Sequence, residues 1–309
     1  DTFFDSGWYF LRYTDAKNKK APFEKDKAMY WMPVDFYTGG AEHATMHLIY
    51  ARFFVKVLRD LGFVEISEPF RRLFNQGMIH GEDGFVMSKS RGNVIDPLDV
   101  SKKYGADSLR LFLVCVASPE KDFSWSITGI EGSLRFLKKL IEYSNIKFGS
   151  SSRRVEHKIN STIRDVTRFI EDVKYNLAVI KIRETFEAFE NEISKKDFES
   201  LLKMLSLFCP HICDEIWTKI GNKGLIILES WPEYDEKKID EKLEEVEKSV
   251  DKTVADILNI LKIISEKQKK EGKKVYLYVI PGEAENYNSE VLSKRVGKEV
   301  ILYKVNDKN

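Results

Sequence analysis

The sequence predicts a mixed α/β segment, then an all-helical segment, then a small α/β appendage. Three observations predict this order. Short apolar runs alternate with glycine turns up to about residue 120, a helical apolar period follows, and a strand pattern returns near residue 275. We therefore expect three domains, over residues 1–125, 126–232 and 233–309.

Composition excludes several classes of protein. The chain has 309 residues, 43% hydrophobic and 32% charged, with a net charge of +1. This apolar fraction supports packed cores, and no apolar run approaches the roughly 18 residues of a membrane span. A net charge near zero excludes a uniformly basic nucleic-acid binder. An odd count of three cysteines argues against a disulfide framework and for a reducing, cytoplasmic location.

Two of the cysteines, Cys209 and Cys213, are four residues apart. A zinc site would need a second pair of ligands, which the sequence does not offer, so we expect both to pack in a core and expect no structural metal.

The first segment shows one strand pattern, one helix pattern and one hairpin pattern. Residues Ala28–Asp35 form a short apolar run that predicts a buried strand, and Gly39-Gly40 then interrupts the chain. Apolar residues from Met46 to Leu61 are spaced 4, 3, 4 and 4, which predicts a helix over His43–Leu61 that stops at Gly62. Residues 78–87 predict a hairpin around Gly81 to Gly84. A strand, a glycine turn and a helix in succession are typical of ligand crevices in α/β sheets.

The second segment predicts a helical bundle. Apolar stripes run over Val179–Ile193 and Leu201–Ile216, and a further helix is predicted over Ile159–Val173. Pro210 should kink or split the second of these helices.

The third segment predicts a partial α/β unit. Residues 235–252 are almost solidly charged, which indicates a solvated helix face or a linker. The apolar spacing continues the helix to Ile264, and a basic stretch over 267–274 is interrupted by Gly272. Strands are predicted over 275–280 and 300–305, which together make a thin sheet.

One motif with chemical content is the loop from Val86 to Asn93, Val-Met-Ser-Lys-Ser-Arg-Gly-Asn. Lys89 can place a compact positive charge on phosphate oxygens, and Ser88 and Ser90 can donate hydrogen bonds to them. An exposed polar loop is the alternative for such a stretch taken by itself.

The second motif is Gly39-Gly-Ala-Glu-His-Ala-Thr-Met-His47. Paired glycines allow a nucleotide to approach the backbone, and Glu42 can accept hydrogen bonds from ribose hydroxyls. His43 and His47 share a helix face, where they are either ligand contacts or satisfied core histidines. A metal site is a further alternative, although the segment between them lacks the Glu of the His-Glu-x-x-His zinc motif.

Together the motifs resemble the second catalytic half of a class I aminoacyl-tRNA synthetase, whose signature loop is Lys-Met-Ser-Lys-Ser. The segment from Gly39 to Phe53 and the opening Asp1 to Tyr9 narrow the resemblance to leucyl-tRNA synthetase. Tyr104 to Arg110 and Pro210 to Trp217 also match, so the resemblance covers about residues 1–232; beyond them the chain is only loosely similar to archaeal-type extensions. Val86 stands at the position of the leading Lys of the signature.

The resemblance implies a fold and a reaction. The fold would be the second half of a Rossmann-type catalytic domain, an anticodon-binding-like helical bundle and a partial α/β extension. The reaction would be ATP-dependent activation of leucine, with Mg²⁺ accompanying ATP, and transfer of the leucyl group to tRNA(Leu). The matching positions for ATP are Gly39, Gly40, Glu42, Val86, Met87 and Lys89, with Lys89, Ser88 and Ser90 as the catalytic group. Those for leucine are Phe3, Ser6, Tyr9, His43 and His47.

The resemblance also implies missing parts. The first half-site motif, of His-Ile-Gly-His type, is not found, and the first residue is not Met. We therefore expect a fragment, inactive alone, whose partners include an N-terminal catalytic half and an editing domain, in the same chain or as a separate subunit.

A non-catalytic tRNA-binding module is the alternative function. Residues 126–225 carry a net charge of +3, from 17 basic and 14 acidic residues. Contacts would be mainly to phosphates. The candidate residues are Arg135, Lys138, Lys139, Arg153, Arg154, Arg164 and Arg168.

Overall fold

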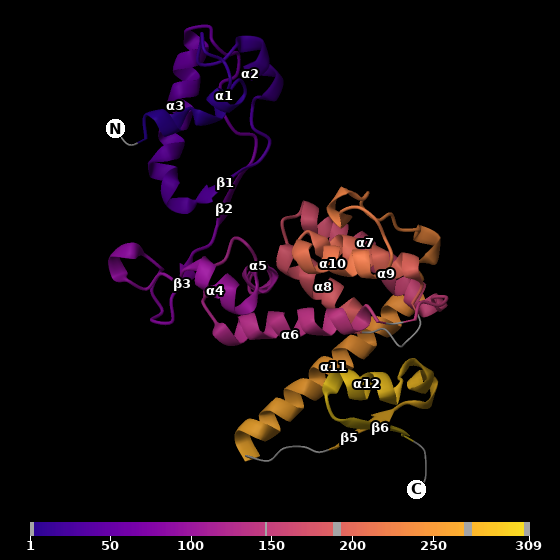
Figure 1. Cartoon of the computed structure of the whole chain (residues 1–309). Helices are drawn as coiled ribbons and strands as arrows, with labels where there is room; N and C mark the ends of the chain where they lie inside the picture. The colour runs from indigo at the N-terminus through magenta and orange to yellow at the C-terminus, as the bar shows by residue number, and fades with distance from the viewer. Residues whose placement is uncertain (1–2, 146, 188–192, 269–273, 306–309) are drawn as a thin grey trace. The chain divides into compact units, whose positions relative to one another are not determined.

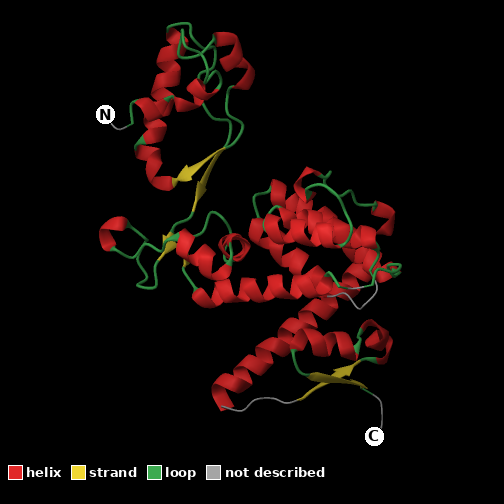
Figure 2. Cartoon of the chain, viewed as in Figure 1, coloured by secondary structure: helices red, strands yellow, loops and turns green. Residues whose placement is uncertain are grey.

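Helices dominate the computed structural model, and the strands form three two-stranded sheets within the described part of the chain (Figures 1 and 2). The structure describes residues 3–145, 147–187, 193–268 and 274–305. Contacts divide the chain into two compact units, 1–97 with 116–127, and 98–115 with 128–309. The three domain limits expected from the sequence stay a prediction.

The first unit packs short helices beside a parallel pair of strands. Strand β1 pairs in parallel with β2, with Tyr37 opposite Leu73 and Gly40 opposite Gln76. The core is centred on Phe10, Leu11, Ala51 and Val55. In chain order the elements up to β2 are η1 (Asp5–Gly7), α1 (Tyr9–Tyr13), α2 (Lys25–Trp31), β1 (Tyr37–Gly40), η2 (Ala41–Thr45), α3 (His47–Asp60) and β2 (Leu73–Gln76).

Helix α3 confirms the predicted helix and its stop. A 3-10 turn, η2, occupies the first residues of the predicted range, so the α-helix itself begins at His47. Gly62 follows the helix with a φ of 81°, a left-handed conformation that glycine adopts without the steric cost of a side chain.

The predicted strand over Ala28–Asp35 is wrong, because residues 25–31 form helix α2. Ala28 and Met32 are buried four residues apart, while Tyr30 is 80% and Trp31 64% exposed. This is helical periodicity; a strand would bury every second residue. A short apolar run does not distinguish the two structures by itself.

The predicted hairpin over 78–87 is confirmed. His80 and Val86 form an antiparallel bridge, and the Gly81 N–H donates to the Phe85 carbonyl at 2.8 Å. Strand β3 (Ile79–His80) also pairs in parallel with β4 (Phe123–Ser124), and η3 (Lys89–Arg91) lies in the loop after the hairpin.

The second unit contains the predicted bundle. Its large core gathers Phe136, Ile182, Phe186 and Phe198. Pro210 begins a new helix, which confirms the predicted break. The helices are α4 (Pro97–Tyr104), α5 (Ala106–Cys115), α6 (Ile127–Tyr143), α7 (Arg153–Glu171), α8 (Tyr175–Glu187), α9 (Lys195–Ser206) and α10 (Pro210–Lys219), followed by the short turns η4 (Ile226–Leu228) and η5 (Glu236–Lys238).

Cys209 and Cys213 are fully buried in this core without a disulfide, as expected. Part of the predicted Val179–Ile193 helix, residues 188–192, lies outside the described residues.

The C-terminal part of this unit places helices on one face of a sheet. Strand β5 (Lys274–Val279) pairs in parallel with β6 (Glu299–Lys304), which confirms both predicted strands. Helices α11 (Glu241–Gln268) and α12 (Ser289–Val296) pack Val254 and Leu292 into one core with Val300 of β6, and η6 (Pro281–Asn286) follows β5. Helix α11 begins within the charged stretch, and the basic stretch lies partly in 269–273, outside the described residues.

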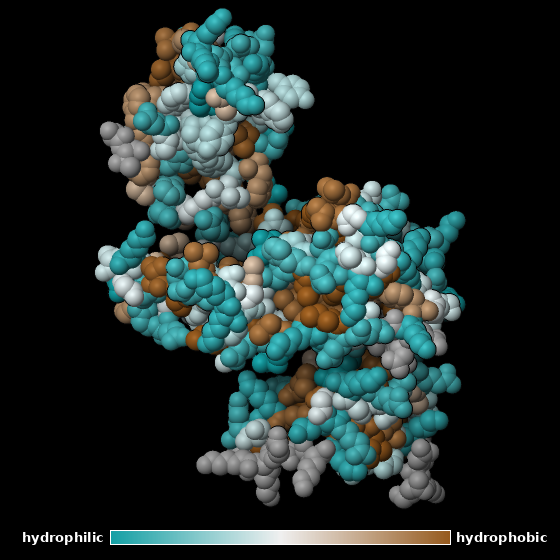
Figure 3. Space-filling view, in the orientation of Figure 1, coloured by the Kyte–Doolittle hydropathy of each residue, from teal (hydrophilic) through white to brown (hydrophobic). Residues whose placement is uncertain are grey.

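Hydrophilic residues cover most of the face drawn in Figure 3, with hydrophobic residues between them. None of the helices that the structure describes combines the length and the apolar character needed to cross a membrane.

Candidate functional site

A cavity lies where β1 ends and α3 begins. Its volume is about 340 Å³, and the chain enters it as an extended strand, turns through η2 and leaves as a helix. The lining residues come from β1, η2, α3 and β2: Tyr37, Thr38, Gly39, Gly40, Glu42, His43, His47, Leu48, Leu73, Asn75 and Gln76. The predicted glycine and histidine residues therefore meet at one cavity.

The two glycines of this cavity have different roles. A side chain at Gly39 would meet no atom within 4 Å, so the space over its backbone is open to a ligand. At Gly40 a β-carbon would collide with the carboxylate of Glu42, which folds back over it. The Asn75 amide donates to the Gly39 carbonyl at 3.1 Å and ties β2 to this turn.

His47 lies against a hydrogen-bonded pair of tyrosines, Tyr37 and Tyr9. The Tyr37 hydroxyl lies 2.6 Å from His47 Nε2 and 2.9 Å from the Tyr9 hydroxyl. Burial, and secondarily the charge of nearby His43, lower the pKa of His47. The imidazole is therefore neutral near pH 7 and suits contact with an uncharged group.

Most of the predicted leucine contacts lie around His43 and His47. The rings of Phe3 and His43 meet edge to face with centroids 6.2 Å apart, as do those of His43 and His47. The Tyr9 and His47 rings are also 6.2 Å apart. Ser6 belongs to η1. Sequence reasoning missed Tyr37, whose signal was its position two residues before Gly39 on the strand that leads into the turn.

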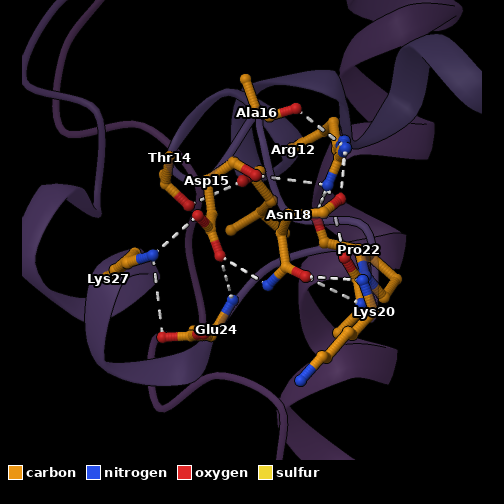
Figure 4. Close-up of polar contacts among 11 residues, drawn as sticks. Arg12, Thr14, Asp15, Ala16, Asn18, Lys20, Pro22, Glu24 and Lys27 are labelled. Carbon is orange, nitrogen blue, oxygen red and sulfur yellow. Dashed lines mark hydrogen bonds and ion pairs between the residues drawn. The ribbon is translucent and has the colours of Figure 1, made fainter.

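The helix that carries Tyr9 is anchored by a polar cluster (Figure 4). The Arg12 guanidinium donates to five backbone carbonyls of the loop over residues 15–22, at 2.7 to 3.3 Å. Asp15 accepts from Lys27 at 2.8 Å and from Asn18 at 2.7 Å, and these bonds lower the pKa of its carboxyl group. The cluster fixes the loop between α1 and α2, and thereby the end of α1.

Asn93 shapes the loop from Val86 to Asn93, which we call the lysine loop. The Asn93 carbonyl oxygen accepts from the Ser88 N–H at 2.8 Å, and its amide donates to Asp83 at 3.1 Å. Lys89 is exposed on the turn between the hydroxyls of Ser88 and Ser90, which lie 3.1 Å apart. The loop thus presents two cations, Lys89 and Arg91, and the hydroxyls of Ser88 and Ser90, and this combination suits contact with phosphate.

The remaining loop residues form its base. Met87 donates its N–H to the Ile79 carbonyl at 2.9 Å, and Val86 is bridged to His80, so both belong to the hairpin. The predicted site residues therefore fall into two groups. One lines the cavity beside β1 and β2, and the other lies in the loop that follows β3.

The predicted tRNA contacts also divide into two sets. Arg135, Lys138 and Lys139 are exposed on α6. The four arginines of α7 contact carboxylates instead: Arg153 with Asp240 at 2.7 Å, Arg154 with Glu247 at 2.7 Å, Arg164 with Glu244 at 3.3 Å and Arg168 with Asp165 at 3.9 Å. Three of these partners belong to α11 or the residue before it, so the arginines hold α11 against the bundle.

Within the described ranges, no three His, Cys, Asp or Glu side chains gather as metal ligands.

Family comparisons assign both parts of the chain. The family described as "tRNA synthetases class I (I, L, M and V)" matches residues 1–126, and "Anticodon-binding domain of tRNA ligase" matches residues 152–277.

The leucine–tRNA ligase of Thermotoga maritima is 42% identical over 274 residues, covering 80% of this chain and 33% of the relative. That of Fervidobacterium nodosum is 42% identical over 264 residues, covering 76% of this chain and 32% of the relative. The chain thus spans about a third of the length of these relatives.

Solved structures of aminoacyl-tRNA synthetases also resemble this chain. The leucyl-tRNA synthetase of Agrobacterium radiobacter K84, solved in a ternary complex with tRNA and LeuAMS, superimposes with a TM-score of 0.70 at 31% identity, over 78% of this chain and 33% of that one. A Mycobacterium tuberculosis methionyl-tRNA synthetase matches with a TM-score of 0.53 at 18% identity, over 71% of this chain and 50% of that one, which shows the fold alone.

The fold is thus a class I catalytic-domain fragment followed by an anticodon-binding helical domain, and the chain belongs to the leucyl-tRNA synthetase family of class I aminoacyl-tRNA synthetases.

Proposed function

We propose that the chain is the part of a leucine–tRNA ligase that supplies one wall of the adenylate site, the lysine loop and a tRNA-contacting bundle. In the whole protein, the leucine carboxylate attacks the α-phosphate of ATP, pyrophosphate leaves, and the leucyl group passes to the terminal ribose of tRNA(Leu). The cavity at the end of β1 carries this proposal, since it gathers Gly39, Glu42, His43 and His47.

ATP would lie over the turn at the end of β1. The open space above Gly39 admits an adenosine, and Glu42 beside Gly40 can accept from ribose hydroxyls. The hairpin backbone at Val86 and Met87 would border the adenine. Leucine would lie among Phe3, Ser6, Tyr9, His43 and His47, where aromatic rings and a neutral imidazole offer an apolar wall.

Lys89 would stabilise charge on the transferring phosphoryl group and on the leaving pyrophosphate, with Ser88 and Ser90 donating hydrogen bonds. The reaction needs no covalent enzyme nucleophile, because positioning and charge stabilisation supply the rate enhancement. Mg²⁺ enters with ATP as part of the substrate. Val86 stands where the signature loop has its leading Lys, so Lys89 is the cation of the signature that remains.

The remaining partners are proposed because the relatives are about three times as long as this chain. The chain spans about a third of its relatives, so the other catalytic half and the editing domain would be supplied from outside these 309 residues. We propose that the chain alone is inactive.

Leucine-dependent ATP–pyrophosphate exchange tests the catalytic role. The assay uses the full-length protein, which means this chain together with the catalytic half and the editing domain proposed above. Lys89→Ala should lower the exchange rate about 100-fold or more, the scale expected for one preorganised charge, while leucine binding persists. Lys102→Ala, an exposed lysine on α4 that is 77% accessible, is the matched control and should exchange at the wild-type rate. Unchanged exchange in Lys89→Ala would refute the assignment.

A non-catalytic tRNA-binding module is the second candidate, favoured by the anticodon-binding match and by the exposed cations of α6. Replacing Arg135, Lys138 and Lys139 by Ala should reduce the slope of log K against log salt for tRNA binding by about 2 to 3. A slope unchanged from wild type would remove α6 from the interface. Leucine-dependent exchange in the full-length protein would reject the purely non-catalytic module.

A further inference from the structure

Tyr37 connects two of the residues proposed to contact leucine. Its hydroxyl lies between the Tyr9 hydroxyl, at 2.9 Å, and His47 Nε2, at 2.6 Å. Its ring stacks on Phe70 with centroids 3.8 Å apart and planes 7° from parallel. Tyr37 also lines the cavity. Its ring is therefore held by Phe70 and is adjacent to any ligand bound in the cavity.

Tyr37 and His47 are both uncharged near pH 7. Burial raises the pKa of the Tyr37 phenol, which therefore keeps its proton, and burial lowers the pKa of His47, which stays neutral. A neutral phenol and a neutral imidazole at 2.6 Å share one hydrogen, and a second hydrogen lies between Tyr37 and Tyr9. The two hydrogen bonds therefore link the tautomer of His47 to the hydrogen positions on Tyr37 and Tyr9, and they hold the plane of the imidazole ring.

We propose that Tyr37 is a positioning residue for the amino-acid substrate, which holds the His47 imidazole in one orientation against the cavity. This inference rests on the proposed function, in which His47 borders the leucine side chain. Tyr37 acts through His47, and Phe70 fixes Tyr37 in turn.

The consequence is specific to the amino acid. An apolar pocket separates near-isosteric side chains by only about 10- to 200-fold, and this discrimination depends on the exact shape of its walls. A His47 ring that can rotate would enlarge the pocket. Leucine would bind less well, and competing aliphatic amino acids would be rejected less, whereas ATP, bound over the glycine turn, would be unaffected.

The Tyr37→Phe variant isolates this effect. Phenylalanine keeps the ring, its volume and the stack on Phe70, and removes both hydrogen bonds. Tyr30→Phe is the matched control, because it makes the same change at a side chain of α2 that is 80% exposed.

The experiment is ATP–pyrophosphate exchange by the full-length protein, with leucine and isoleucine as separate substrates. In Tyr37→Phe, we expect the leucine KM to rise about 10-fold, the ratio of kcat/KM for leucine over isoleucine to fall about 5-fold, and kcat and the ATP KM to stay within about 2-fold. The thermal midpoint should match that of Tyr30→Phe.

Three results would overturn the inference. A leucine KM and selectivity equal to wild type would show that Tyr37 does not position His47. A parallel rise of both KM values with a lowered thermal midpoint would show a purely structural role. Absence of leucine-dependent exchange in the wild-type protein would reject the proposed function itself, and this inference with it.

Discussion

Glu247 fixes α11 to the bundle, and neutralising it should loosen this contact. Its carboxylate accepts from Lys158 at 2.9 Å and from Arg154 at 2.7 Å. The Glu247 and Lys158 side chains are only 11% and 13% exposed, so Glu247→Gln leaves a buried ammonium without its counter-charge. Loss of one partner of a buried pair costs about 3–5 kcal/mol, and we expect about 3 because the Glu184 carboxyl also interacts with Lys158.

Hydrogen exchange by peptide mass spectrometry is the suitable assay, because a chain with two compact units has no single unfolding free energy. In Glu247→Gln, the protected amides of α11 over residues 243–258 should exchange about 100-fold faster, since each 1.4 kcal/mol is a factor of ten. Glu266→Gln is the control, because its pair with Lys262 is 65% and 72% exposed and contributes less than about 0.5 kcal/mol.

The pH dependence gives a second readout. Burial opposes ionisation of Glu247, but Lys158 and Arg154 outweigh it and lower the pKa below its ordinary 4.5. The ionised group therefore stabilises the fold above pH 4.5, and this contribution is lost as pH falls through the lowered pKa. The difference between wild type and Glu247→Gln should shrink there. Equal exchange at pH 7 in Glu247→Gln and Glu266→Gln would show that Glu247 does not hold α11 to the bundle.

Two further predictions concern local contacts. Asp107 on α5 accepts from the Ile212 N–H at 2.7 Å and so caps the N-terminus of α10. Asp107→Ala should therefore lower the opening free energy of α10, measured by hydrogen exchange, by about 2 kcal/mol. Unchanged protection of α10 would contradict the capping role. The Gly84 carbonyl, and then Asp122, raise the pKa of His80. The contribution of His80 to the stability of the hairpin is therefore complete below its ordinary pKa of 6.5 and is lost as pH rises through the raised pKa. Proteolysis of the hairpin, normalised to an unstructured peptide, should accelerate over that pH range in wild type but not in His80→Gln; the same pH profile in both would reject the contribution of His80.

Elements with a long apolar period were predictable from the sequence, and short ones were not. The helix from His47 and the break at Pro210 follow from spacing and backbone chemistry that act within a few residues. The run after Ala28 failed as a strand because four or five apolar residues fit either period, and only the packing of Ala28 and Met32 decides between them.

The candidate site was predictable where its residues are adjacent in sequence. Gly39 to His47 lie on one strand, turn and helix, so one motif predicts their meeting. The contact between Arg154 and Glu247 spans 93 residues, and no local pattern reports it. The charge of residues 126–225 therefore indicated Arg153, Arg154 and Arg164 as tRNA contacts, whereas the fold pairs them with acids of α11 or of the residue before it.

If this chain forms part of a leucine-activating site, as proposed above, leucine should be the preferred amino acid, and a panel of amino acids tests this most directly. The full-length protein would be assayed for ATP–pyrophosphate exchange with each of the twenty amino acids separately. Leucine should give the highest kcat/KM, with isoleucine, valine and methionine at least about 10-fold lower. A higher value for any other amino acid, or no exchange with leucine, would contradict it.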